Sequence, residues 1–281
     1  MITAPFDYEA PESLEEAIRM LHENGEDAKL LAGGHSLVPL MKLRLAAPTV
    51  LIDLRKIPGL HGIQRDDGDW RIGPMTRHAD LQDTPEVGVA SRAASLIADQ
   101  QVRNRGTIGG SLAHADPASD MPAVLVACEG DLTVRGTGGE RTIAAADLFQ
   151  DYMTTSLAQD EVITEVRLPA LEGYGVGYQK FTRRAEDWAM VGVAALVKKG
   201  ADGSCEDVRI GLTNMASTPI RASAAENALR GGALDAESVA AAAGHAAEGT
   251  DPPGDLNATP EYKRHLARVL TRRALEEAAG L

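Results

Sequence analysis

The chain has 281 residues, of which 44% are hydrophobic and 25% charged, and its formal net charge at pH 7 is −13. This composition supplies enough apolar side chains for a core and excludes gross disorder. The negative charge argues against non-specific binding to nucleic acid or to anionic lipid, because both need basic protein surface.

The first segment, residues 1–56, is predicted to be a small α/β unit. Its start, MITAPFDYEAPESLEEA, lacks the basic-then-apolar pattern of a secretory signal, so we expect a cytoplasmic protein. Ser13 and Glu16 are spaced as a capping box and predict a helix start. The stretches AKLLAGG and TVLIDLR then predict two short strands, with a glycine turn and a short helix between them.

Residues 57–172 are predicted to form a second α/β unit. DWRIG, DLTVRG and EVITEVRLP read as strands, and VGVASRAASLIA reads as a helix. Between them lies QQVRNRGTIGGSLAHADPASDMPA, a polar and glycine-rich stretch. It is long for a plain connection, and long connections in compact domains are often functional.

Residues 173–281 are predicted to form a third unit, with an antiparallel sheet followed by helices. The stretch EGYGVGYQ, with glycines at 173, 175 and 177, is expected to be a flexible boundary. Two strands about the GADGS turn fit a hairpin. Three helical stretches follow, and the last is predicted to bury a face made of Tyr262, Leu266, Val269, Leu270 and Ala274.

Several familiar sites have no signature in this chain. Cys128 and Cys205 form no C-x-x-C pair, so the chain offers no thiolate set for an iron–sulfur cluster or a structural zinc. The phosphate-binding P-loop and the G-x-G-x-x-G dinucleotide motif are also absent. His245 and Glu248 are spaced H-x-x-E, but such a lone pair is usually a solvated helix surface rather than a metal site.

Two similar glycine turns are the strongest local signal. Ala32-Gly33-Gly34-His35-Ser36 and Thr107-Ile108-Gly109-Gly110-Ser111 each place two glycines before a hydroxyl residue and a predicted short helix. Glycines allow backbone N–H groups to approach a ligand, and successive N–H groups bind anions. With 28 glycines in the chain, each turn alone is most simply an ordinary turn. Together they leave a shared anionic ligand and two unrelated turns equally open.

The residues around the turns resemble a known family. LAGGHSLVPLMKLRLAAPTVLIDLRKI and TIGGSLAHADPASDMPA are similar to the FAD-binding medium subunits of the molybdenum hydroxylases, the xanthine oxidase family. VRIGLTNMASTPIRA and QKFTRRAEDWAMVGVAA resemble the C-terminal part of the same subunits. The similarity is greatest to the branch that serves aerobic carbon monoxide dehydrogenases. It implies an α/β plus α+β fold: a two-subdomain, PCMH-type (vanillyl-alcohol-oxidase-like) FAD-binding domain, then an antiparallel sheet with helices.

The resemblance also implies where FAD binds. Residues 31–38 and 107–111 would surround the cofactor, with backbone N–H groups on its pyrophosphate. The residues so implied are Leu31, Ala32, Gly33, Gly34, His35, Ser36, Leu37, Val38, Thr107, Ile108, Gly109, Gly110 and Ser111. Ser111 stands where many relatives have asparagine, and its shorter side chain is expected to lose one cofactor hydrogen bond.

Four further residues receive roles from the resemblance. Asp120 would accept hydrogen bonds from sugar hydroxyls; alternatively it is a helix N-cap. Ile163 would contact the flavin ring through its backbone, and Lys180 would lie near the polar edge of the ring, unless it is a solvated strand lysine. Trp188 would shield the flavin face, or else belong to the core. His35 invites comparison with flavoenzymes that bind flavin covalently through a Gly-Gly-His turn, but the resemblance favours a non-covalent contact.

The implied function is electron transfer within a complex. A large subunit would carry molybdopterin and a small subunit two [2Fe–2S] clusters, and the three chains are expected to assemble as a dimer of heterotrimers. Electrons would pass from the clusters to FAD and on to an external acceptor, with quinone expected; this chain would supply no catalytic acid or base. Two alternatives remain: a stand-alone FAD oxidase with flavin attached to His35, and a non-enzymatic scaffold.

Overall fold

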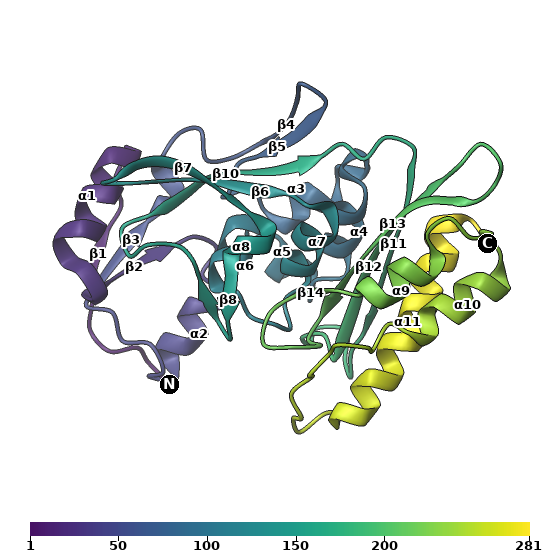
Figure 1. The fold of residues 1–281 in the computed structure, drawn as a ribbon. Coiled ribbons are helices and arrows are strands. Elements are labelled where there is room, and N and C mark those ends of the chain that lie inside the picture. The colour runs from purple at the N-terminus through teal and green to yellow at the C-terminus, as the bar shows by residue number, and fades with distance from the viewer.

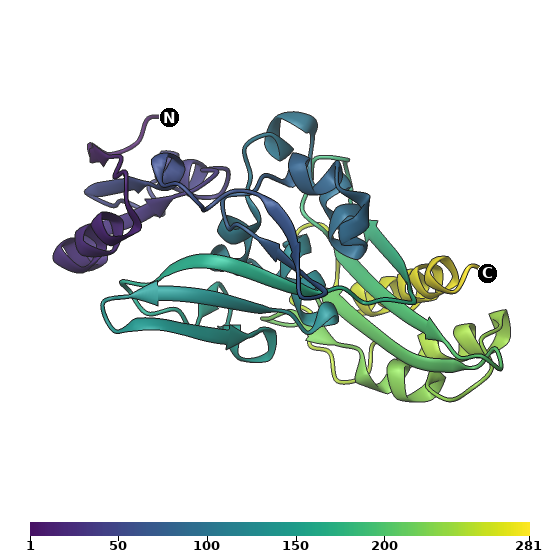
Figure 2. The same cartoon turned by 90° about the horizontal axis from the view of Figure 1, so that it is seen from above.

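The computed structural model describes residues 1–281, which form three larger sheets that follow one another along the molecule and one further two-stranded sheet (Figure 1). The two termini lie at opposite ends, as the view from above also shows (Figure 2). No helix combines the length and the apolar character that crossing a membrane requires.

The first sheet has three strands in the order β1-β3-β2, and both pairings are parallel. Ser13 caps the first helix, because its side chain accepts a hydrogen bond from the Glu16 N–H. The second hydrogen bond of the predicted capping box differs: the Glu16 carboxylate accepts from the N–H of Glu12, one residue before Ser13. The elements are β1 (Asp7–Glu9), α1 (Leu14–Asn24), β2 (Ala28–Leu31), α2 (Leu37–Lys42) and β3 (Val50–Asp53), with 3₁₀ turns at Gly25–Asp27 and Leu54–Lys56.

The second sheet has five antiparallel strands in the order β4-β5-β10-β6-β7. Five helices are inserted between β5 and β6, and two of them, α4 and α7, pack against the third sheet. The strands are β4 (Ile63–Asp66), β5 (Asp69–Ile72), β6 (Asp131–Gly136), β7 (Gly139–Ala144) and β10 (Val162–Pro169), with a separate hairpin of β8 (Phe149–Asp151) and β9 (Thr154–Thr155). The helices are α3 (His78–Gln82), α4 (Val89–Ser95), α5 (Gln100–Arg103), α6 (Ile108–His114), α7 (Asp120–Cys128) and, after β7, α8 (Ala145–Leu148), with a 3₁₀ turn at Pro85–Val87.

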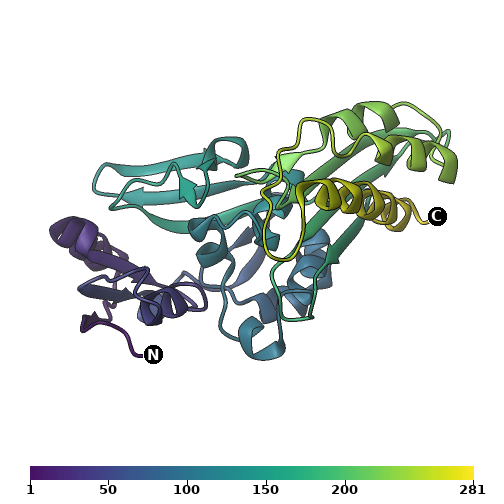
Figure 3. The same cartoon turned by 90° about the horizontal axis from the view of Figure 1, so that it is seen from below.

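The third sheet is antiparallel, in the order β11-β12-β13-β14. Helices α4 and α7 pack on one face, and α11 packs along β11 and β12 on the other, where Figure 3 shows it in yellow. The elements are β11 (Tyr174–Phe181), β12 (Val191–Lys199), β13 (Cys205–Thr213), β14 (Ile220–Arg221), α9 (Ser223–Leu229), α10 (Ala236–Gly244) and α11 (Pro260–Ala279).

The prediction of a flexible boundary at the 173–177 glycines is wrong, because Gly175 and Gly177 lie inside strand β11. A Cβ at these positions would lie 1.8 Å from the Ala278 carbonyl oxygen and 2.1 Å from that of Ala274. The glycines therefore allow the backbone of α11 to rest directly on the strand.

The predicted buried face of α11 is also wrong at its start. Tyr262 is 43% exposed, whereas Lys263 is fully buried. The ammonium group of Lys263 lies 2.8 Å from the Asp255 carboxylate, so the apolar stem of the lysine fills the core while its charge is paired at the edge. The face therefore runs through Lys263, Leu266 and Leu270.

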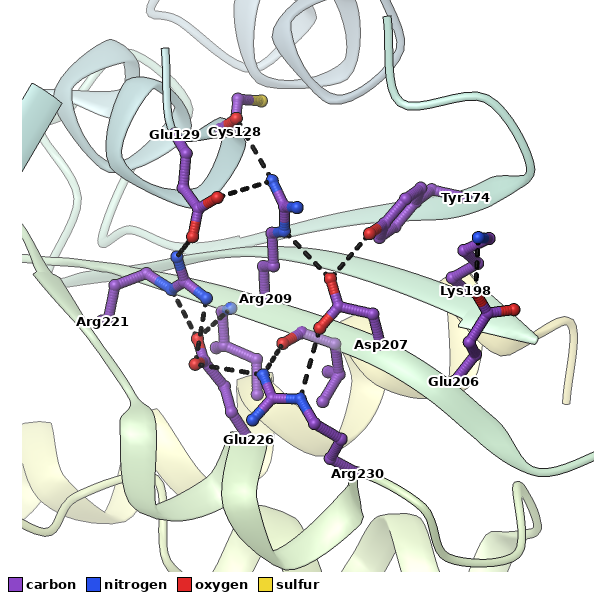
Figure 4. A network of polar contacts seen from close by, with 12 residues as sticks. Cys128, Glu129, Tyr174, Lys198, Glu206, Asp207, Arg209, Arg221, Glu226 and Arg230 are labelled. Atoms are coloured by element: carbon purple, nitrogen blue, oxygen red, sulfur yellow. Dashed lines mark hydrogen bonds and ion pairs between the residues drawn. The ribbon is translucent and has the colours of Figure 1, made fainter. Parts of the chain in front are cut away.

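Helix α7 is held by the third sheet at its C-terminal end (Figure 4). Glu129, which follows the helix, pairs with Arg209 at 3.1 Å and with Arg221 at 2.9 Å. Gly211 on β13 leaves room for the helix, since a Cβ there would lie 2.3 Å from the Ala123 carbonyl oxygen. We keep the division into residues 1–56, 57–172 and 173–281 as a proposal; the three separate sheets support it, and the contacts of α7 join the second and third parts.

Candidate cofactor site

A cavity of about 710 Å³ lies where the three parts of the chain meet. Its walls come from the turn after β2, from α6 and the start of α7, from the β8–β9 hairpin, and from β11 with the loop that follows it. Of the residues implied by the family resemblance, the cavity is lined by Ala32, Gly33, Gly34, His35, Ser36, Leu37, Thr107, Gly109, Gly110, Ser111, Asp120, Ile163, Lys180 and Trp188.

Three of the implied residues do not line the cavity. Leu31 and Ile108 are buried in separate hydrophobic clusters, and Val38 packs against the cluster that contains Leu31. Their side chains pack into the protein and anchor the two glycine segments on the side away from the cavity.

The turn after β2 offers free backbone donors. It follows the carboxyl end of a parallel strand, which is where ligands bind in open α/β sheets. The N–H groups of residues 33–37 make no hydrogen bond within the protein. Gly34 has a φ of +78°, a conformation that glycine adopts at little cost. Five successive residues that line a cavity and carry free N–H groups form a site suited to an anion.

The second glycine segment has a different local structure. Gly109 and Gly110 lie in the first turn of α6, and Thr107 is its N-cap, with its side chain accepting from the Gly110 N–H. The N–H groups of Ile108, Gly109 and Ser111 donate to backbone carbonyls at 2.8–3.0 Å. All four N–H groups of residues 108–111 are therefore engaged, so the free donors for a diphosphate come from the first turn.

The glycines of the two segments allow them to touch. A Cβ on Gly33 would lie 2.3 Å from the Arg105 carbonyl oxygen, and one on Gly110 would lie 3.4 Å from the Ala32 Cβ. The two turns are 70 residues apart in the chain but form one continuous wall. This proximity supports one ligand shared by both.

Asp120 and Lys180 form a buried ion pair in the cavity wall. Lys180 Nζ lies 2.9 Å from Asp120 Oδ2, with side-chain exposures of 5% and 3%, and the Tyr178 hydroxyl donates to Asp120 Oδ1 at 2.6 Å. Burial raises the pKa of Asp120, while Lys180 and Tyr178 oppose that rise. Both alternatives for these residues are wrong: Ser119 is the N-cap of α7, and Lys180 is not solvated.

Ile163 lies on a strand, whereas Trp188 lies in a loop. Ile163 is on β10, where the register with β6 shifts between Ile163 and Glu165, and such bulges are frequent beside binding sites. Trp188 is 52% exposed in the loop between β11 and β12, so the alternative that places it in the core is wrong.

Three histidines face the cavity, and only His35 was among the implied residues. Burial, followed by the charge of Arg105, lowers the pKa of His35, and burial lowers that of His114. Burial lowers the pKa of His78 to about 4. His78 carries no motif that sequence reasoning could use, because its place in the cavity depends on contacts with residues far along the chain.

The residues present fit FAD. A diphosphate needs several donors, which the first turn supplies; sugar hydroxyls need an acceptor, which Asp120 supplies; and a ring system needs apolar walls, which Leu157, Val162 and Ile163 help to form. The glycines of the two segments allow these walls of the cavity to pack closely, because an added Cβ at Gly33 or Gly109 would meet backbone or proline atoms within 3 Å.

Comparison with known proteins shows which family the chain belongs to. Residues 4–171 match the FAD binding domain in molybdopterin dehydrogenase, and residues 177–278 match the CO dehydrogenase flavoprotein C-terminal domain. The carbon monoxide dehydrogenase medium chain of Hydrogenophaga pseudoflava is 43% identical, covering 99% of this chain and 98% of that one. Subunit alpha of the 6-hydroxypseudooxynicotine dehydrogenase complex of Paenarthrobacter nicotinovorans is 40% identical, covering 97% and 94%.

A solved structure shows the same fold over its whole length. The matching chain of the CO dehydrogenase from Oligotropha carboxidovorans has a TM-score of 0.96 and 38% identity, covering 100% of this chain and 99% of that one. The fold expected from the resemblance is thereby confirmed. This chain belongs to the family of FAD-binding medium subunits of molybdopterin-containing dehydrogenases.

Proposed function

We propose that this chain is the FAD-carrying electron-transfer subunit of an aerobic carbon monoxide dehydrogenase. Its partners in the proposal are a large molybdopterin-binding subunit and a small subunit with two [2Fe–2S] clusters, assembled as a dimer of heterotrimers in the cytoplasm or at the inner face of the membrane. The observation that carries the proposal is the 43% identity to a carbon monoxide dehydrogenase medium chain across 99% of this chain.

Bound FAD supplies the redox chemistry, since it takes up electrons singly and releases them as a pair to an external acceptor, for which we propose a quinone. The residues of this chain bind and orient it. The free N–H groups of residues 33–37 hold the diphosphate, and Asp120 accepts from a sugar hydroxyl with a remaining lone pair.

Lys180 sets the charge at the cavity wall. A cation beside the ring would favour negative charge on the ligand. Because Asp120 lies 2.9 Å away, the field of Lys180 at the ring is weaker than that of an unpaired lysine. Trp188 is exposed and lines the cavity, and we propose that its indole covers one face of a bound ring and limits contact with solvent.

The substrate is decided by the partner, so the test is the identity of the proteins that co-purify with this chain. A relative 40% identical to it belongs to a 6-hydroxypseudooxynicotine dehydrogenase complex, so similarity of this subunit alone does not determine the substrate. We expect a large subunit that contains copper and molybdenum and oxidises carbon monoxide. Purification as a lone, active oxidase would refute the subunit proposal.

His35 makes the covalent alternative testable. His35 lines the cavity, and partial burial followed by the charge of Arg105 lowers its pKa, which favours the uncharged imidazole. We propose a non-covalent contact, so mass spectrometry of the denatured chain should give the mass of the polypeptide alone. A chain that retains the mass of FAD would establish the covalent alternative. The match to an FAD-binding domain argues against the scaffold alternative.

A further inference from the structure

His78 is a buried histidine whose ring has no partner in the protein. It begins α3, is 5% exposed and lines the cavity. Nδ1 is buried without a hydrogen-bond partner, and no side-chain hydrogen bond of the structure uses Nε2. Buried polar groups are normally satisfied, because leaving one unpaired costs free energy. An ordinary core histidine would bond at least one ring nitrogen to the protein.

The His78 ring lies close to the first glycine turn, with Gly106 between them. The His78 N–H donates to the Gly106 carbonyl at 3.0 Å, and a Cβ on Gly106 would lie 2.8 Å from His78 Cδ2 and 3.3 Å from Nε2. On its other side, Gly106 approaches Gly33, whose Cβ would lie 2.8 Å from the Gly106 Cα. The ring, Gly106 and the first turn are therefore successive neighbours.

The charge state of His78 leaves it one donor. Burial lowers its pKa to about 4, and the charges of Arg103 and His35 act in the same direction, so the ring is neutral at pH 7. Nδ1 has no exposed surface, so Nε2 is the ring nitrogen that a ligand in the cavity can reach. A proton on Nε2 leaves Nδ1 as an unpaired acceptor, which proteins bury more readily than an unpaired donor.

We propose that His78 is a further FAD-binding residue, donating a hydrogen bond from Nε2–H to an oxygen of the diphosphate. The inference rests on the proposed FAD site and adds a side-chain donor to the backbone donors of residues 33–37. It also gives the ring the partner that the protein itself does not provide.

The test compares three ligands on the full chain, purified with any subunits that accompany it. FAD and ADP carry the diphosphate, and riboflavin does not. His78→Phe fills the space without a donor, His78→Gln keeps an N–H donor, and His61→Phe changes an exposed histidine outside the cavity. Dissociation constants are measured by calorimetry, and folding is checked by thermal unfolding.

We expect His78→Phe to weaken FAD and ADP binding by about tenfold to a hundredfold, the effect of losing a hydrogen bond to a charged group. Riboflavin binding should not change, His78→Gln should recover part of the loss, and His61→Phe should resemble the wild type. Unchanged FAD binding in His78→Phe, or riboflavin weakened as much as ADP, overturns the inference.

A second measurement serves if His78→Phe does not fold. Phosphorus NMR of bound FAD should show shifted diphosphate resonances in His78→Gln, and unshifted resonances would overturn the inference. Failure of the proposed function gives a different result. A wild-type chain that binds no FAD would refute the proposed FAD site. A wild-type chain whose FAD binding does not depend on His78 would refute only this inference.

Discussion

Replacing Gly33 with alanine tests whether contact between the two glycine segments builds the site. The new Cβ would lie 2.3 Å from the Arg105 carbonyl oxygen and 2.8 Å from the Gly106 Cα. Carbon and oxygen atoms in contact are about 3.3 to 3.6 Å apart, so the segments must separate by roughly 1 Å. Such overpacking costs about 1 to 3 kcal/mol of folding free energy.

The separation should also misplace the free N–H groups of the turn. Losing one hydrogen bond to a charged group costs about 1.5 to 3 kcal/mol, which corresponds to about a tenfold to a hundredfold rise in the dissociation constant of FAD. Titration of the FAD-free protein measures this rise, and urea unfolding measures the stability. Gly138→Ala is the matched control, because its Cβ would meet nothing within 4 Å. If Gly33→Ala and Gly138→Ala bind FAD equally well, the close approach of the segments has no part in binding.

Three further predictions concern the surroundings of the site. Lys180→Met leaves the buried Asp120 carboxylate without its cation and should cost about 3 to 5 kcal/mol in urea unfolding, whereas Arg272→Met, which breaks an exposed pair with Glu276, should cost less than about 1 kcal/mol; equal costs would contradict the buried pair. Burial would raise the pKa of Asp207, but hydrogen bonds from Tyr174 and Arg209 lower it to about 2. Because the folded pKa lies below the unfolded value of about 3.9, this stabilisation is complete above pH 4 or so and is lost as the pH falls toward about 2; Asp207→Asn should flatten that part of the stability–pH curve, and an unchanged curve would exclude the assignment. Gly177→Ala places a Cβ 2.1 Å from the Ala274 carbonyl oxygen and should lower the melting temperature well below that of Gly138→Ala, so similar melting temperatures would argue against direct contact between β11 and α11.

The sequence was informative where the signal is local. The strands around AKLLAGG and TVLIDLR have the apolar pattern of short buried strands, and they occur as β2 and β3. The Ser13 cap also depends on neighbours in the chain and is present. The turn that supplies the N–H donors follows β2, as the glycine pattern predicted.

The rest depends on contacts between distant residues. Asp120 and Lys180 are 60 positions apart, so nothing local indicates that each is the other's partner. Gly175 and Gly177 suggested flexibility because glycine has many conformations, and only the position of α11 shows that they are needed for close packing. The apolar pattern of the last helix did not include Lys263, and only the structure shows that this lysine is buried and pairs with Asp255 at the edge of the core.

The contacts at the two ends of α7 cross the boundary between the two matched domains, residues 4–171 and 177–278. The helix lies within residues 4–171, yet Lys180 and Tyr178 hold its first residue, and Arg209 and Arg221 hold the glutamate after its last. Exchanging C-terminal domains between relatives would therefore exchange Lys180, the cation of the cavity wall, as well as the supports of the helix. Recombined subunits should inherit their redox potential partly from the domain that is not classified as binding flavin.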